Sequence, residues 1–148
     1  MMDLTKQEKD IRKFVWNLEQ WVIDTLVEFN IFAERRKNRV GIWVINKKNE
    51  QYNSTPNLDL KIGSIGLRLK NWISYFGISI NVCNDLSYFD GIIPCGNLGF
   101  GVTSIWEQGQ KTSLTELDYV LKQKFNNVFN INNTKKKSRS ATINTVET

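Results

Sequence analysis

Histidine is absent from this chain of 148 residues, and cysteine and proline each occur only twice. Without histidine, neither a serine–histidine nor a cysteine–histidine catalytic pair can form, and no cluster with metal-ligand spacing remains. The two cysteines, Cys83 and Cys95, are too few for a framework of disulfide bonds. We therefore expect a protein that binds no metal and keeps its thiols reduced.

Long hydrophobic runs are also missing. No segment reaches the roughly 18 consecutive apolar residues of a membrane span, and the charged N-terminus lacks the apolar core of a signal peptide. The composition is otherwise close to that of globular proteins, with 41% hydrophobic and 24% charged residues. The sequence thus predicts a cytoplasmic protein that does not enter a membrane.

The positive charge is concentrated near the C-terminus. Residues 135–148 contain four basic side chains and one glutamate, so they carry +3 of the net charge of +5 and leave +2 elsewhere. This segment is rich in Asn, Thr, Ser and Lys and shows no apolar periodicity, which favours a solvated tail over an arm that binds nucleic acid. We expect one domain over residues 1–131 and a disordered basic polar tail over residues 132–148.

Two helices are predicted from apolar spacing. Residues 11–29 place apolar side chains three and four positions apart, as in an amphipathic helix. Leu114, Leu117, Leu121, Phe125 and Val128 share a face in a second helix over residues 113–129. Ser113 or Thr112 is the expected cap of this helix, because Glu116 follows Ser113 at the spacing of a capping box.

Three segments between these helices read as strands, namely residues 41–45, 61–69 and 72–82. The polar residues 46–57, which include Pro56, indicate an exposed hairpin or loop. Helices that present apolar stripes to such strands predict an α/β (α+β) domain, in which a mixed sheet packs against helices.

Lys61 opens the run Lys61-Ile-Gly-Ser-Ile-Gly66, which reads as a buried strand that enters a tight turn. Two interpretations of Lys61 remain open. A lysine at a strand end is commonly exposed. Placed before an apolar run, it could instead be desolvated, which would suit it to proton transfer.

Cys95 lies between Pro94 and Gly96, a context typical of a presented nucleophile. A thiol with a pKa near its reference value of about 8.5 is mostly protonated at neutral pH, and a nearby ammonium favours the thiolate. A pair of Lys61 and Cys95 would therefore suit acyl transfer through a thioester. The competing interpretation of Cys95 is inert packing, and Cys83, which has no such context, is expected to be structural.

Several short sequence motifs occur in a fixed order along the chain. Together they resemble the lipoate-biosynthesis octanoyltransferase family, the lipoyl(octanoyl) transferases. The resemblance runs from about Asp10 to about Trp106. The motifs on which the resemblance rests are Arg39-Val-Gly-Ile-Trp-Val44, Lys61-Ile-Gly-Ser-Ile-Gly-Leu-Arg68, Gly77-Ile-Ser-Ile-Asn-Val82, Asp85-Leu-Ser-Tyr-Phe-Asp90, Pro94-Cys-Gly96 and Gly101-Val-Thr-Ser104.

The resemblance implies a fold like the biotin/lipoate protein ligase catalytic domain. It also implies transfer of octanoyl from octanoyl-acyl carrier protein, without a further cofactor, to a lysine of lipoyl-dependent enzyme domains. The implied partners are acyl carrier protein, the lipoyl domains of 2-oxoacid dehydrogenases and the glycine cleavage H protein. Carried over residue by residue, Cys95 would hold the acyl thioester, and Lys61 would lower the pKa of Cys95 and transfer protons.

By the same resemblance, two triplets would line the acyl-binding site: Ser64, Ile65 and Gly66, and Gly77, Ile78 and Ser79. Two departures from the family pattern stand out. Phe76 occupies the position before Gly77 where the family has a histidine. The family's upstream Arg-Gly-Gly segment and its Tyr-His-Gly-Pro-Gly-Gln-like loop do not occur, so residues 1–131 are expected to form an N-terminally truncated octanoyltransferase domain.

Two other functions remain open. The chain could be a catalytically inactive remnant, in which the Lys61 and Cys95 pair persists without the other wall of the acyl tunnel. It could also be an ATP-dependent lipoate or biotin ligase. A ligase would need a glycine-rich loop to bind an adenylate, and the sequence shows no sign of one.

Overall fold

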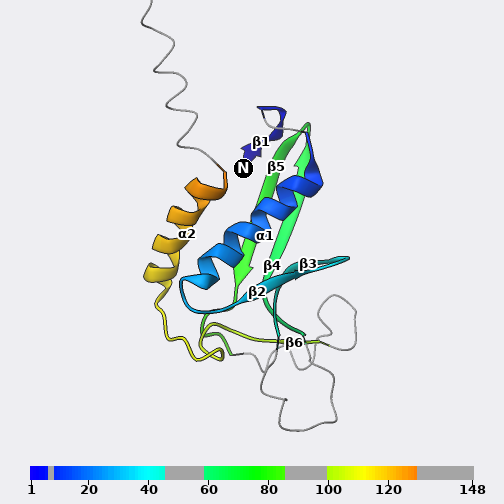
Figure 1. Cartoon of the computed structure of the whole chain (residues 1–148). Coiled ribbons are helices and arrows are strands. Elements are labelled where there is room, and N and C mark those ends of the chain that lie inside the picture. The colour runs from blue at the N-terminus through cyan, green and yellow to red at the C-terminus, as the bar shows by residue number, and fades with distance from the viewer. Residues whose placement is uncertain (7–8, 46–58, 86–99, 130–148) are drawn as a thin grey trace, which may run out of the picture.

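A single sheet with two helices on one of its faces makes up the computed structural model, which describes residues 1–6, 9–45, 59–85 and 100–129 (Figure 1). The elements follow in the order β1 (Met2–Asp3), η1 (Leu4–Lys6), α1 (Ile11–Val27), β2 (Ala33–Arg36), β3 (Arg39–Ile45), β4 (Asp59–Lys70), β5 (Ile73–Ile80), β6 (Gly101–Val102) and α2 (Leu114–Val128). The strand order is β1-β5-β4-β3-β2, and β6 pairs with β4. The pairing of β6 is parallel and the others are antiparallel, so the expected mixed sheet with packed helices is confirmed.

Helix α1 begins and ends with side-chain and backbone caps. The carboxylate of Asp10 accepts hydrogen bonds from the amides of Arg12 and Lys13 at 2.9 and 3.1 Å. At the other end, the Ile31 amide donates to the carbonyl of Leu26. The buried face of α1 consists of Phe14, Leu18, Glu19, Val22, Thr25 and Leu26. The predicted amphipathic helix is thus confirmed.

Helix α2 begins with the capping box expected from the sequence. The Ser113 hydroxyl accepts from the Glu116 amide, and the Glu116 carboxylate accepts from the Ser113 amide. This backbone hydrogen bond lowers the pKa of Glu116. The expected apolar face holds except at Leu114, which is 69% exposed.

Strands β4 and β5 form a long hairpin around a two-residue turn. Asn71 and Trp72 occupy this turn with φ of 51° and 63°, the left-handed conformation of a type I′ turn. The two strands predicted over residues 61–69 and 72–82 are therefore confirmed, but the tight turn that residues 61–66 were expected to enter lies farther along the chain, at Asn71 and Trp72. Gly63 and Gly66 lie in continuous strand and pair with β5. Trp72, predicted as part of a strand, belongs to the turn.

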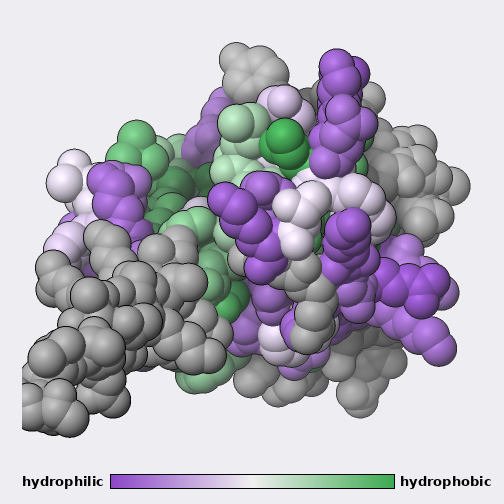
Figure 2. Space-filling model, turned by 90° about the horizontal axis from the view of Figure 1, so that it is seen from above, coloured by the Kyte–Doolittle hydropathy of each residue, from purple (hydrophilic) through white to green (hydrophobic). Residues whose placement is uncertain are grey.

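The core lies between the helices and one face of the sheet. Ile42, Val44 and Ile62 pack with Val22 and Leu26 of α1 in one buried cluster. A second cluster at the other end of α1 contains Leu4, Phe14, Leu18 and Phe129. Figure 2 views the molecule from above Figure 1 and shows hydrophobic residues exposed between hydrophilic ones.

Several sequence expectations concern the termini and the cysteines. Residues 130–148 and Cys95 lie outside the described residues, so the disordered tail stays a prediction. Cys83 is a free, exposed thiol that does not pack in the core, and the expectation that it has no catalytic role stays a prediction. No helix among the described residues is long and apolar enough to cross a membrane.

Candidate functional site

Lys61 lies in the middle of the sheet, flanked by strands on both sides. It pairs with Trp43 of β3 on one side and with Val102 of β6 on the other. Its carbonyl accepts a hydrogen bond from the Thr103 amide at 3.0 Å. The residue is 8% exposed, which excludes the interpretation of Lys61 as an exposed strand-end lysine. Because its neighbour Ile62 points into the core under α1, Lys61 points to the opposite face of the sheet.

The ring of Trp43 lies beside the Lys61 ammonium. Lys61 Nζ is 5.4 Å from the ring centroid, within the range of a cation–π interaction. Trp43 is itself 1% exposed. Phe100 meets it edge-on at 4.7 Å, and the Arg39 guanidinium lies 4.8 Å from its centroid. The Trp43 indole N–H donates to the Arg39 carbonyl at 3.3 Å, which fixes the plane of the ring.

Gly41 leaves space for the Lys61 side chain. Its φ is +137°, a conformation that L side chains rarely adopt. A Cβ added at Gly41 would lie 2.9 Å from Lys61 Cε and 3.2 Å from the carbonyl oxygen of Gly63. Any larger residue would therefore displace the end of the lysine side chain and press on β4.

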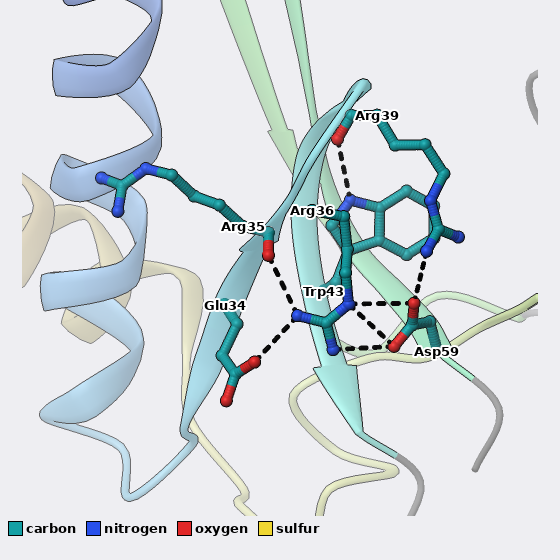
Figure 3. A network of polar contacts seen from close by, with 6 residues as sticks. All are labelled: Glu34, Arg35, Arg36, Arg39, Trp43 and Asp59. Carbon is teal, nitrogen blue, oxygen red and sulfur yellow. Dashed lines mark hydrogen bonds and ion pairs between the residues drawn. The ribbon is translucent and has the colours of Figure 1, made fainter.

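A cluster of charged groups joins the β2–β3 hairpin to β4 two residues before Lys61. Asp59 Oδ1 accepts from Arg36 Nη2 at 2.7 Å, and Asp59 Oδ2 accepts from Arg39 Nη2 at 2.6 Å. Figure 3 shows Arg39 and Asp59 on the side of β3 away from α1, whereas Arg35 points toward the helix. The hydrogen bonds from Arg36 lower the pKa of Asp59, and those from Asp59 raise the pKa of Arg36.

A buried carboxylate on α1 supports the same hairpin from the other face. Glu19 is 6% exposed, and its Oε1 accepts from the Gly41 amide at 3.2 Å. Its second oxygen lies 3.2 Å from Arg35 Nε. Glu19 thus binds the backbone of β3 next to the point where the β3–β4 register shifts, between Ile42 and Trp43.

The two triplets assigned to acyl binding lie opposite each other in the β4–β5 hairpin. The register pairs Ser64 with Ser79, Ile65 with Ile78, and Gly66 with Gly77. The middle pair of isoleucines faces the helices and packs against the core. The serine and glycine pairs are exposed on the face away from the helices. Lys61 shares this face because the register shift between Ile42 and Trp43 interrupts the alternation of β4 before Ser64.

The structure shows no conformational or packing requirement for glycine at Gly66 or Gly77. Neither Gly66 nor Gly77 has a positive φ, and a Cβ on either would meet no described atom within 4 Å. Glycine in a strand weakens the sheet and commonly marks a place where something approaches the backbone closely. The pair therefore leaves a shallow, side-chain-free surface on the sheet.

Asn81 joins the end of β5 to β6 beside this surface. Its amide donates to the Ile62 carbonyl at 2.9 Å, and its side-chain Nδ2 donates to the Thr103 carbonyl at 3.0 Å. These bonds hold β6 beside the first residues of β4. Strand β5 ends at Ile80 and does not pair with that part of β4. The backbone around Lys61 is thus paired on both sides although β5 does not reach it.

The structure brings together seven of the eight expected site residues, Lys61 and the two triplets, on β4 and β5. Cys95 lies outside the described residues, so its distance from Lys61 stays a prediction. Phe76, at the family's histidine position, faces the helices, where its ring centroid lies 5.8 Å from that of Phe14. It is therefore a core residue here and does not belong to the open face.

Sequence reasoning assigned no role to Trp43, Gly41 or Glu19. The alternation of β3 could have identified the first two, since Ile42 and Val44 take the core face and leave Gly41 and Trp43 on the other. Glu19 stands beside Leu18 within the apolar stripe of α1, where a buried carboxylate requires a partner.

The arrangement is suited to proton transfer and to binding an extended, uncharged chain. An ammonium lies at one end of a patch of the sheet face whose exposed residues are Ser64, Gly66, Gly77 and Ser79. Among the described residues, no group of Cys, Asp and Glu is placed to hold a metal ion.

The family model and the similar known proteins agree on one family. Residues 1–126 match the family described as the lipoyl protein ligase A/B catalytic domain. The octanoyltransferase of Zymomonas mobilis is 46% identical over 84% of this chain and 54% of its own length. That of Rhodospirillum rubrum is 46% identical over 87% and 56%, and that of Brucella suis 43% identical over 91% and 51%. The chain spans about half the length of the curated relatives it matches.

Proposed function

Because the chain belongs to the lipoyl protein ligase A/B catalytic domain family, we propose that it acts in octanoyl transfer for protein lipoylation. The donor is octanoyl-acyl carrier protein. The acceptor is a lysine of a lipoyl domain, either in a 2-oxoacid dehydrogenase or in the glycine cleavage H protein. The relatives named octanoyltransferase support this choice of reaction.

The observation that carries the proposal is the pairing of the two triplets. Residues 64–66 and 77–79 are eleven or more positions apart in sequence, yet the hairpin register places them side by side. Their exposed members are serines and glycines, which leave room for an acyl chain against the sheet. Lys61, three residues before Ser64 on the same strand, stands at the end of this surface.

The proposed reaction has two steps. The Cys95 thiolate attacks the octanoyl thioester, a new thioester forms on Cys95, and the carrier thiol leaves with a proton. The amine of the acceptor lysine then attacks this thioester, the amide forms, and Cys95 leaves as the thiolate with which the cycle began. Lys61 supplies the proton to the departing carrier thiolate and accepts one from the attacking amine. As written, the reaction balances without a nucleotide or a metal.

Intact-protein mass spectrometry after incubation with octanoyl-acyl carrier protein tests this proposal. The unmodified chain should gain one octanoyl group, and Cys95→Ala should abolish the gain. Cys83→Ser is the matched control, because it removes the other thiol, which is exposed, and it should keep the adduct.

The possible outcomes separate the alternatives. A gain that persists in Cys95→Ala would remove Cys95 from the nucleophile role. No gain from a folded sample of the unmodified chain would favour an inactive chain. A gain on an added lipoyl domain, rather than on the chain, that requires ATP and free octanoate would indicate a ligase.

A further inference from the structure

The end of the Lys61 side chain is held by groups that have no assigned role in the reaction. The main chain of Lys61 is fixed by pairing with β3 and β6. A long lysine side chain nevertheless has several rotatable bonds, and ordering it carries an entropy cost. A proton-transfer group must lie in one geometry, so something has to restrict these bonds.

The first restriction comes from Gly41. Lys61 Cε and Nζ lie 2.9 and 3.5 Å from the position of an added Cβ at Gly41. The lysine side chain therefore lies over the backbone of Gly41, in space that only glycine leaves open. The Glu19 carboxylate holds this part of β3 in place by accepting from the Gly41 amide at 3.2 Å.

The second restriction comes from Trp43. Its ring centroid lies 5.4 Å from Lys61 Nζ, and aromatic faces attract cations at this range. The ring cannot turn away easily, because it is 1% exposed and packs against Phe100. Arg39 brings a second positive charge to the same ring, but Asp59 neutralises it with a hydrogen bond of 2.6 Å.

We propose that Gly41 and Trp43 are positioning residues of Lys61: Gly41 provides the channel for its stem, and Trp43 holds its ammonium. This inference rests on the proposed function only for the use to which Lys61 is put. We call Gly41 and Trp43 together the clamp of Lys61. The clamp affects the reactivity of one lysine, so it is testable without any acyl transfer.

Competitive acetylation measures the clamp directly. The folded chain is treated briefly with an N-hydroxysuccinimide ester of acetate, then digested, and the labelling rate of Lys61 is divided by that of Lys122. Lys122 is a suitable reference because its side chain is 75% exposed and lies on α2. Loss of the cation–π contact in Trp43→Leu should raise the Lys61 ratio by roughly 3- to 30-fold.

Two further variants and one control separate the clamp from general destabilisation. Trp43→Phe keeps an aromatic face and should restore most of the protection, whereas Gly41→Ala should raise the ratio by displacing the stem. Phe14→Leu is the matched control, because Phe14 is 2% exposed but belongs to the other core cluster. An unchanged ratio in Trp43→Leu, or an equal rise in Phe14→Leu, would overturn the proposal. If Trp43→Leu does not fold, the other two variants decide the question. A raised ratio in Gly41→Ala with little change in Trp43→Phe would support the clamp, and an unchanged ratio in Gly41→Ala would overturn it.

The pH profile of Cys95 alkylation links the clamp to the reaction. In a Cys83→Ser background, Lys61→Met should move this profile to higher pH, and Trp43→Leu should move it part of the way. A profile that Lys61→Met leaves unchanged would contradict the proposed role of Lys61. It would not affect the acetylation result, so the two failures are distinguishable.

Discussion

Replacing Gly77 with valine should stabilise the fold and impair acyl transfer. A Cβ at Gly77 meets no described atom within 4 Å, and its φ suits an ordinary residue. Glycine within a strand costs roughly 0.5–1 kcal/mol relative to alanine, and β-branched residues favour strands on a scale of about 1 kcal/mol. The expected gain is therefore about 1 kcal/mol, or a rise in Tm of about 2–8 °C for a domain of this size.

The effect on function should have the opposite sign. The isopropyl group would stand on the open face beside Gly66, where the acyl chain is proposed to lie. Adding methyl groups to a filled space typically costs about 1–3 kcal/mol, which corresponds to about 5- to 150-fold in binding or rate. Formation of the octanoyl adduct on Cys95 should slow by this factor.

Thermal unfolding and intact-mass time courses measure the two effects on the same samples. Gly77→Ala is the graded control, since it relieves the glycine cost but intrudes less on the open face. A lower Tm in Gly77→Val would refute the assignment of an open face, whatever the activity. A higher Tm with an unchanged rate of adduct formation would refute the placement of the acyl chain on this pair.

Two further predictions concern the charged cluster and the start of α2. Asp59 has a lowered pKa because of its hydrogen bonds from Arg36 and Arg39, so its stabilising contribution is complete above the unfolded pKa of about 3.9 and is lost as pH falls through the folded value. Urea unfolding should therefore show a smaller loss of stability below about pH 4 in Asp59→Asn than in the unmodified chain, and identical slopes would contradict this. Ser113→Ala removes the cap of α2 and should cost about 1 kcal/mol, seen as a lower Tm. Ser113→Asp should restore it, and an unchanged Tm in Ser113→Ala would argue against the capping box.

Local signals in the sequence predicted the helices well and the hairpin only in part. The cap of α2 and the apolar stripe of α1 are encoded within a few residues, so spacing alone found them. The strands predicted over residues 61–69 and 72–82 put the reversal close to Asn71 and Trp72, where it occurs, whereas Gly63 and Gly66 suggested a turn nearer residue 66. Tryptophan is uncommon at a positive φ, so the sequence does not indicate that Trp72 belongs to the turn.

The site was predictable as far as the family resemblance reached. It named Lys61 and both triplets, which lie on the neighbouring strands β4 and β5, but it could not give the contact between Lys61 and Trp43. That contact depends on the irregular β3–β4 register between Ile42 and Trp43, a long-range feature with no signature in either strand. Strands β1 and β6 have two residues each, too few for a period to be visible.

The two-residue turn between β4 and β5 also determines which changes this hairpin can accept during evolution. Side chains alternate between the two faces of a sheet, so one inserted or deleted residue in either strand would reverse the faces of all residues beyond it. Gly77 and Ser79 would then enter the core, and Ile78 would face outward. Homologues should accordingly vary in residue type at exposed hairpin positions outside the two triplets, such as Arg68 and Tyr75, yet keep the number of residues between the two triplets constant.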